Sequence, residues 1–237
     1  PREAKITKKY HKKWKIDYYF HFWPESFFHS VLPKSFKYKS IVYGLESALY
    51  QNVKNFDERI KNKILNSGAV GNQKPLSRIL NDIRRPKWNA LRVYYLRTIV
   101  NNLPYVDYFP TLQNEFVGDK YPLLLEKYQA SIAACTVTTV AKMWEIPAAG
   151  CMTFLEVNEK NNADSFGFKD QENAIFVNEK NYKEKFQEYL ENIENSKWRK
   201  IAENGRKFVM ENLNNDKAVE SLVELMRDVI KEKNQRI

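Results

Sequence analysis

Cysteine is scarce in this sequence, which argues against both a disulfide framework and a zinc site. Cys135 and Cys151 are the two cysteines among the 237 residues, and they form no CxxC pair. The three histidines, His11, His21 and His29, lie far from both cysteines in the sequence, so no Cys/His metal cluster is predicted. Free cysteine is commonly buried, so we expect two buried thiols and, with them, a reducing, cytoplasmic compartment.

Long apolar runs are missing as well. No stretch reaches the roughly 20 apolar residues that a membrane-spanning helix needs. The opening segment, 1–15, is basic and polar, whereas a signal peptide requires an apolar core. Hydrophobic residues nevertheless make up 43% of the chain, which is enough for one substantial core or two small ones. We therefore expect a globular protein without a transmembrane helix.

Acidic residues are outnumbered, 29 against 39 basic ones, and the formal net charge is +10. Much of the positive charge lies in two segments, 8–15 and 74–97. A basic surface can bind nucleic acid, acidic lipid or phosphate-bearing small molecules. No nucleic-acid-binding motif accompanies the charge, so no nucleic-acid partner is expected, while peripheral membrane contact stays open.

From residue 61 onward, short apolar segments of strand and helix length alternate. Strands are expected at 63–67, 105–109, 130–134 and 151–157, and helices at 76–84, 90–101, 121–128 and 138–149. This alternation predicts the α/β class, with a parallel sheet covered by helices. The final third is helical by its apolar spacing, and Asn181 and Asp216 are predicted N-caps.

The first sixty residues have a different texture. They are rich in aromatic side chains and contain two short strand candidates, at 16–22 and 40–43. They show no helical pattern long enough to cover both faces of a sheet. We therefore expect this segment to be too small for a complete domain.

Two loops follow strands in the predicted sheet, and ligands of open parallel sheets bind at the carboxyl ends of strands. The first loop contains Ser67, Gly68 and Gly71 ahead of a helix. Glycine lets the backbone approach a ligand closely, and the helix that follows offers free N–H groups to a phosphate. The loop matches neither GxGxxG nor a P-loop, and an ordinary strand-to-helix turn explains it equally well.

The second loop carries Thr136, Thr138 and Thr139, whose hydroxyls can cap a helix or bind a phosphate. Lys142 and Glu145 follow three residues apart, so they share one helix face. The lysine could neutralise a diphosphate, and the carboxylate could accept hydrogen bonds from both hydroxyls of a ribose. Spacing by itself favours the simpler interpretation of an ion pair on the surface.

The segment KMWEIPAAGCMTFL, from Lys142 to Leu155, resembles the "E-hydrophobic-x-A-x-G" signature of GT-B-fold glycosyltransferases. Within them it is most similar to the spore-maturation (CgeB-like) branch of the group 1 type. Weaker matches occur in the order that this family has. They are the interdomain element at 41–50, the first strand and glycine turn at 63–68, a short helix at 121–127, a later strand at 168–177 and the "I-A-x-N-G-R" helix at 198–209.

The resemblance implies a fold and a division of the chain. The fold is a Rossmann-like parallel sheet, the C-terminal half of a GT-B fold, with a helical C-terminal extension. Residues 1–56 would be the remnant of an N-terminal, acceptor-side domain with its linker, 57–215 the nucleotide-sugar-binding domain, and 216–237 a helix crossing back. The missing N-terminal domain would come from a separate chain fragment, or the chain would oligomerise.

The implied activity is transfer of a sugar from a nucleotide-diphosphate sugar to an unknown acceptor, which could be a glycan, a protein or a small molecule. No cofactor besides the donor is expected. Glu145 aligns with the glutamate that holds the ribose in this family. The other donor-binding residues implied by the resemblance are Ser67, Gly68, Arg78, Thr136, Thr138, Thr139 and Lys142.

Two departures from the family pattern support an alternative. Val137 stands where many retaining members have a sugar-contacting glutamate, eight positions before Glu145. The lysine-glycine pair of the first loop is also absent, with Lys74 and Arg78 as possible substitutes. The alternative is a non-catalytic, GT-B-like module that binds a nucleotide or a partner. No catalytic residue is assigned.

Overall fold

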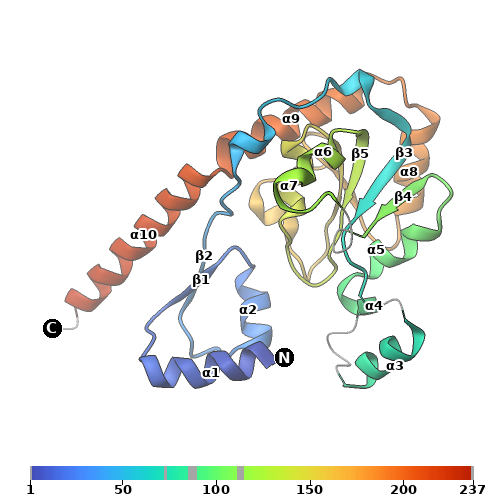
Figure 1. Cartoon of the computed structure of the whole chain (residues 1–237). Helices are drawn as coiled ribbons and strands as arrows, with labels where there is room; N and C mark the ends of the chain where they lie inside the picture. Colours follow the sequence, from blue (N-terminus) through green and yellow to red (C-terminus); the bar gives the residue numbers. More distant parts are fainter. Residues whose placement is uncertain (1, 72–73, 85–89, 111–114, 236–237) are drawn as a thin grey trace.

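The computed structural model describes residues 2–71, 74–84, 90–110 and 115–235, and a five-stranded parallel sheet lies at its centre (Figure 1). The strands are, in spatial order, β4 (Val106–Phe109), β3 (Ile60–Ser67), β5 (Tyr128–Ala133), β6 (Met152–Glu156) and β7 (Ile175–Val177). Each neighbouring pair is parallel. The predicted α/β class and Rossmann-like sheet are therefore confirmed.

The central strands β5 and β6 are mostly apolar because both faces of the sheet are covered there. All residues of β5 and β6 are buried. Successive side chains point to opposite faces: Ile64 packs into one core cluster and Leu65 into the other, and Phe154 and Leu155 divide in the same way. The two apolar cores thus lie on the two faces of a single sheet.

Helices cover both faces of the sheet. One face carries α6 (Tyr121–Leu125) and α7 (Lys142–Ala148), and the other carries α5 (Tyr95–Ile99), α8 (Tyr182–Glu191) and the beginning of α9 (Lys197–Asn212). The helix predicted at 90–101 is interrupted, because Tyr94 leaves helical geometry between α4 (Ala90–Val93) and α5. The helix predicted from Thr138 begins only at Lys142, since a turn takes up the intervening residues.

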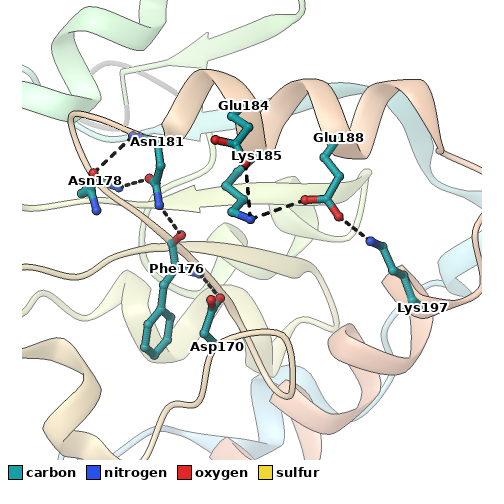
Figure 2. A network of polar contacts seen from close by, with 8 residues as sticks. All are labelled: Asp170, Phe176, Asn178, Asn181, Glu184, Lys185, Glu188 and Lys197. Carbon is teal, nitrogen blue, oxygen red and sulfur yellow. Dashed lines mark hydrogen bonds and ion pairs between the residues drawn. The ribbon is translucent and has the colours of Figure 1, made fainter.

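Strand β7 is an edge strand, and polar side chains hold it in place (Figure 2). The Phe176 N–H, which faces away from the sheet, donates to Asp170 Oδ1 at 2.7 Å. Beyond the strand, the Asn178 N–H donates to Asn181 Oδ1 at 2.7 Å, and Asn181 Nδ2 donates to the Phe176 carbonyl at 3.3 Å. Lys197 and Glu188, 2.5 Å apart, then join α8 to α9. These contacts occupy backbone groups that an open edge would leave unpaired.

The N-terminal segment forms a small unit with its own sheet. It consists of α1 (Arg2–Trp14), β1 (Tyr19–His21), α2 (Glu25–Val31) and β2 (Tyr38–Ser40), with β1 and β2 parallel. Strand β1 lies within the predicted strand 16–22, β2 overlaps the predicted strand 40–43 only at Ser40, and the helices α1 and α2 were not predicted. Helix α2 forms because Phe28 stacks on Tyr38, with ring centroids 4.0 Å apart. This tertiary contact outweighs the strand preference of aromatic residues.

The last helix, α10 (Asn215–Asn234), returns to the N-terminal unit. Its Asp228 pairs with Lys39 at 2.9 Å, and its Lys233 pairs with Asp17 at 2.7 Å. The helix is capped by Asn214, whose side chain accepts from the Lys217 N–H at 2.9 Å, so the predicted cap Asp216 is wrong. None of the described helices has the length and apolar character to cross a bilayer.

Three aromatic rings join the N-terminal unit to the sheet domain. Tyr43 stacks on Trp144 of α7, with centroids 4.9 Å apart and planes 12° apart. Phe22 meets the same Trp144 edge-on at 5.3 Å. Thr139 Oγ1 also donates to the Phe22 carbonyl at 3.4 Å. The fixed position of α7 therefore depends on both parts of the chain.

A packing constraint in α9 yields a prediction. A Cβ on Gly205 would lie 2.6 Å from the Asn173 carbonyl oxygen, closer than real contacts allow. Alanine normally stabilises an exposed helix relative to glycine by up to about 1 kcal/mol. Here Gly205→Ala should instead destabilise the protein by about 1–3 kcal/mol, measured by urea unfolding, because α9 must move off the backbone. Glu203→Ala, at an exposed position of α9, is the control and should change stability little.

Candidate functional site

The end of β3 is a tight turn built on Gly68. Gly68 has a φ of +103°, a conformation that side chains with a Cβ rarely adopt. Its N–H donates to the Phe109 carbonyl at 2.9 Å, and its carbonyl accepts from the Tyr108 hydroxyl at 2.9 Å. A Cβ here would collide with Lys142 Nζ and lie 3.2 Å from Arg97 Nη1. Glycine is therefore needed because two cationic side chains approach the turn.

Lys142 is the first of these cations. It opens α7, it is only 9% exposed, and its ammonium donates to the Ser67 carbonyl at the end of β3. Burial lowers the pKa of Lys142 well below its ordinary value, the nearby Arg97 lowers it further, and Glu145 opposes both effects. The interpretation of Lys142 as part of a surface ion pair is therefore wrong, because its ammonium points inward under the sheet edge.

Arg97 is the second cation, and the sequence analysis did not select it. It lies in the middle of α5 and is 4% exposed. Its guanidinium donates to the Ala69 carbonyl at 2.9 Å and also to the Ala134 carbonyl, so it bridges the loops that follow β3 and β5. It lies over the Tyr94 ring, 4.5 Å from the centroid. The sequence did contain a sign that Arg97 is buried. Arg97 directly follows Leu96 and lies four residues after Val93, in a segment that is otherwise largely apolar.

The two cations are buried with carbonyl oxygens as partners, which is an unfavourable arrangement unless an anion joins them. Their mutual repulsion contributes to the lowered pKa of Lys142. A phosphate placed beside Gly68 would offset both the burial of the charges and their repulsion.

The end of β3 is anchored by polar side chains on either side. Ser67 Oγ and the buried Tyr121 hydroxyl are 2.6 Å apart, and burial raises the pKa of Tyr121. Asn66 Nδ2 donates to the Arg97 carbonyl at 2.9 Å, which ties β3 to α5. Ser67 therefore contributes its carbonyl to Lys142 and its hydroxyl to Tyr121.

Glu145 lies one turn along α7 from Lys142. Its side chain is half-buried, and burial raises the pKa of its carboxyl group while the Lys142 charge opposes the rise. Burial raises the pKa values of the Tyr43, Tyr50 and Tyr121 hydroxyls, and the charge of Glu145 adds to each rise. The Glu145 carboxylate therefore interacts electrostatically with three tyrosine hydroxyls.

The predicted threonines occupy different environments. Thr136 lines a cleft described below, and its N–H donates to the Val93 carbonyl at 3.0 Å. Thr138 is buried, and its Oγ1 has no hydrogen-bond partner among the described residues. Thr139 is directed to the N-terminal unit by its bond to the Phe22 carbonyl. The side chain of Arg78, in α3 (Pro75–Arg84), lies outside the described residues.

Glu156, at the end of β6, is a second buried carboxylate that sequence reasoning missed. It is 3% exposed, burial raises its pKa to about 7, and the nearby Thr136 hydroxyl and the charge of Arg97 oppose the rise. Its Oε2 has no partner among the described residues, while Asn158 Nδ2 donates to Oε1 at 3.4 Å. A carboxylate ending a continuous apolar strand was the available signal.

A cleft of about 1010 Å³ opens between the N-terminal unit and the sheet domain. Of the predicted donor-binding residues whose side chains the structure describes, Thr136 lines it. Its walls come from α2, from α4 and α5, and from the loop after β5, where Thr136 and Val137 lie. Ligand clefts in proteins commonly have volumes of roughly 300–1,000 Å³. The other lining residues are Ser26, Phe27, Ser30, Leu91, Arg92, Tyr95, Glu159, Lys160 and Glu179.

Comparison with known proteins assigns the fold. No protein-family model matches the sequence, and no curated protein matches it. Among solved structures, sucrose-phosphate synthase from Thermosynechococcus elongatus is similar with a TM-score of 0.56 and 13% identity, over 88% of this chain and 56% of that one. A glycosyltransferase from Rickettsia africae gives a TM-score of 0.55 and 12% identity, over 97% and 81%.

HepE from Anabaena, solved with UDP, gives a TM-score of 0.53 and 13% identity, over 81% of this chain and 57% of that one. The chain thus spans little more than half the length of two of these three structures. At such low identity the likeness concerns the fold. The chain has the Rossmann-like half of a GT-B glycosyltransferase fold, with a helical C-terminal extension, as its sequence predicts.

The raised pKa of Glu156 predicts a pH-dependent stability. Its folded pKa is about 7 against an ordinary 4.5, so the folded state holds a proton that the unfolded state releases between these values. Stability contributed by this group is therefore lost as pH rises through that range. Glu156→Gln should be more stable than the wild type at pH 8 by on the order of 3 kcal/mol, and should show little difference near pH 4.5.

Urea unfolding at both pH values measures this difference. Glu159→Gln, at an exposed position, is the control and should track the wild type. An equal effect of Glu156→Gln at the two pH values would show that the Glu156 carboxyl group does not change protonation between them.

Proposed function

We propose that this chain binds the nucleotide-diphosphate sugar of a glycosyltransferase, with the diphosphate held by Lys142 and Arg97 beside the Gly68 turn. The observation that carries the proposal is the pair of buried cations at the carboxyl edge of a parallel sheet. Support comes from the shared fold, since HepE was solved with UDP and the pneumococcal transferase GtfA with UDP and GlcNAc.

The proposed chemistry follows from charge. In sugar transfer the bond between the sugar and the diphosphate breaks, and negative charge grows on the departing diphosphate. Positioned cations stabilise that charge more than they stabilise the intact donor, and so they accelerate the reaction. Lys142 and Arg97 are held in place by the Ser67, Ala69 and Ala134 carbonyls, so little reorganisation is needed when the charge develops.

Glu145 is proposed to accept hydrogen bonds from the ribose hydroxyls. It lies on α7 one turn from Lys142, so a nucleotide whose diphosphate contacts Lys142 has its ribose on the same helix. The cleft between α2 and the loop at Thr136 is proposed to admit the acceptor. The finer proposal, from the sequence, is a spore-maturation (CgeB-like) transferase of the cytoplasm, a compartment with which the two buried free thiols agree.

The alternative is a binding module without catalysis. Val137 lines the cleft where the family pattern has a sugar-contacting glutamate, and this observation favours the alternative. The N-terminal unit has only two short strands, so the proposal includes a further N-terminal domain from a separate chain fragment. Measuring transfer and donor hydrolysis with a panel of nucleotide sugars, without and with that domain, separates the two functions.

Calorimetry tests the diphosphate site directly. A nucleoside diphosphate from a panel should bind more tightly than its nucleoside, and Lys142→Met should reduce that advantage by about 1.5–3 kcal/mol, the value of a hydrogen bond to a charged group. Lys200→Met removes the same charge from an exposed position of α9 and should leave the advantage unchanged. Equal affinity for nucleoside and diphosphate in the wild type contradicts the proposal.

The ribose contact predicts a different pattern. Glu145→Ala should weaken binding of the ribonucleoside diphosphate by about 1.5–3 kcal/mol. It should have much less effect on the 2′-deoxy form, which lacks one of the two hydroxyls. A thermal unfolding curve like that of the wild type ensures that the variant is folded. Equal losses of affinity for the two ligands would contradict the assignment of Glu145 to the ribose hydroxyls.

A further inference from the structure

Helix α3 exposes an unusual set of apolar side chains. Leu76, Ile79, Leu80 and Ile83 are 78%, 55%, 52% and 72% exposed. Their spacing places all four on one face of the helix. Figure 1 shows α3 at the periphery, away from the sheet and from α10. A continuous stripe of large aliphatic side chains in water is unfavourable, so this face requires a surface to cover it.

The charges around the stripe indicate the kind of surface. From residue 74 to residue 84 the sequence has three basic residues, Lys74, Arg78 and Arg84, against the single acidic Asp82. The exposed Arg92 of α4 adds another basic residue nearby in the chain. The whole chain carries a net charge of +10. An apolar stripe with basic flanks complements a surface that is apolar inside and anionic outside, as the face of an anionic bilayer is.

A second exposed stripe, on α10, provides an internal comparison. Val219, Met226 and Ile230 are 59%, 57% and 58% exposed. The α10 segment, however, has more acidic residues than basic ones: Asp216, Glu220, Glu224, Asp228 and Glu232 against Lys217, Arg227, Lys231 and Lys233. An anionic surface would repel α10 or attract it no more than a neutral surface does. The sign of the charge around the exposed apolar residues therefore differs between α3 and α10.

We propose that α3 is an interfacial helix that docks this protein on the surface of an anionic membrane. The four aliphatic side chains enter the boundary between headgroups and acyl chains, and Lys74 and Arg84, at the two ends of the segment, contact the lipid phosphates. This inference is independent of the proposed transferase activity, since it requires only the exposed helix.

Vesicle co-sedimentation of the whole chain tests the proposal. The protein should bind vesicles of phosphatidylcholine mixed with phosphatidylglycerol, bind phosphatidylcholine alone weakly, and lose affinity as salt is raised. The double variant Leu76→Ser/Ile83→Ser should reduce binding by about tenfold or more. Lys74→Glu/Arg84→Glu should reduce it as well. Val219→Ser/Met226→Ser, on α10, is the matched control and should bind like the wild type.

Several outcomes would overturn the proposal. Absent binding, equal binding to both vesicle types, or unchanged binding by the folded Leu76→Ser/Ile83→Ser variant would each do so. Sedimentation velocity without lipid identifies the competing occupant. A dimer that dissociates in the Leu76→Ser/Ile83→Ser variant would show that a second copy of this chain covers α3. Circular dichroism and thermal unfolding of each variant establish that lost binding is not lost folding.

Discussion

The carboxyl edge of the sheet depends on two positive charges that are buried with backbone carbonyls as their partners. Arg97 bridges the loops after β3 and β5, and Lys142 bonds to the last residue of β3. These contacts determine where the Gly68 turn lies and where α7 begins. Such an arrangement is costly in a folded protein, because each charge gives up water for only one or two carbonyl oxygens. In the proposed function, the bound diphosphate would offset this cost.

Two buried carboxyl groups complete the electrostatics of the same region. Burial raises the pKa values of Glu145 and Glu156, while the cations lower them. The region therefore holds two groups of each sign at the ends of adjacent strands and helices. An arriving diphosphate would be attracted by the two cations and repelled by the ionised carboxylates, in surroundings with little water to screen these charges. Perturbed pKa values of this kind cluster at functional sites.

The small N-terminal unit acts on the site through α7. Tyr43 and Phe22 pack on Trp144, which lies between Lys142 and Glu145 in the chain. The α10 helix holds the other side of that unit through exposed ion pairs, which individually contribute little. The aromatic contacts are thus the stronger link, and the cleft lies between the parts that they join. Motion of the N-terminal unit would change the shape of the cleft and the environment of Glu145 together.

The sequence by itself determined the alternation of strands and helices, the parallel sheet and the region of the site, because short apolar segments and glycine turns are local signals. It also selected Gly68 and Lys142. It did not identify Arg97 or Glu156 as site residues. A single charged residue in an apolar segment can be recognised as part of a site only when the structure shows which distant carbonyls or loops surround it. Nor did it reveal α2, which forms because Phe28 stacks on Tyr38. Only the tertiary structure decided that Lys142 points inward. The choice between a surface ion pair and a buried cation depends on the Ser67 carbonyl, which the end of β3 brings next to the Lys142 ammonium.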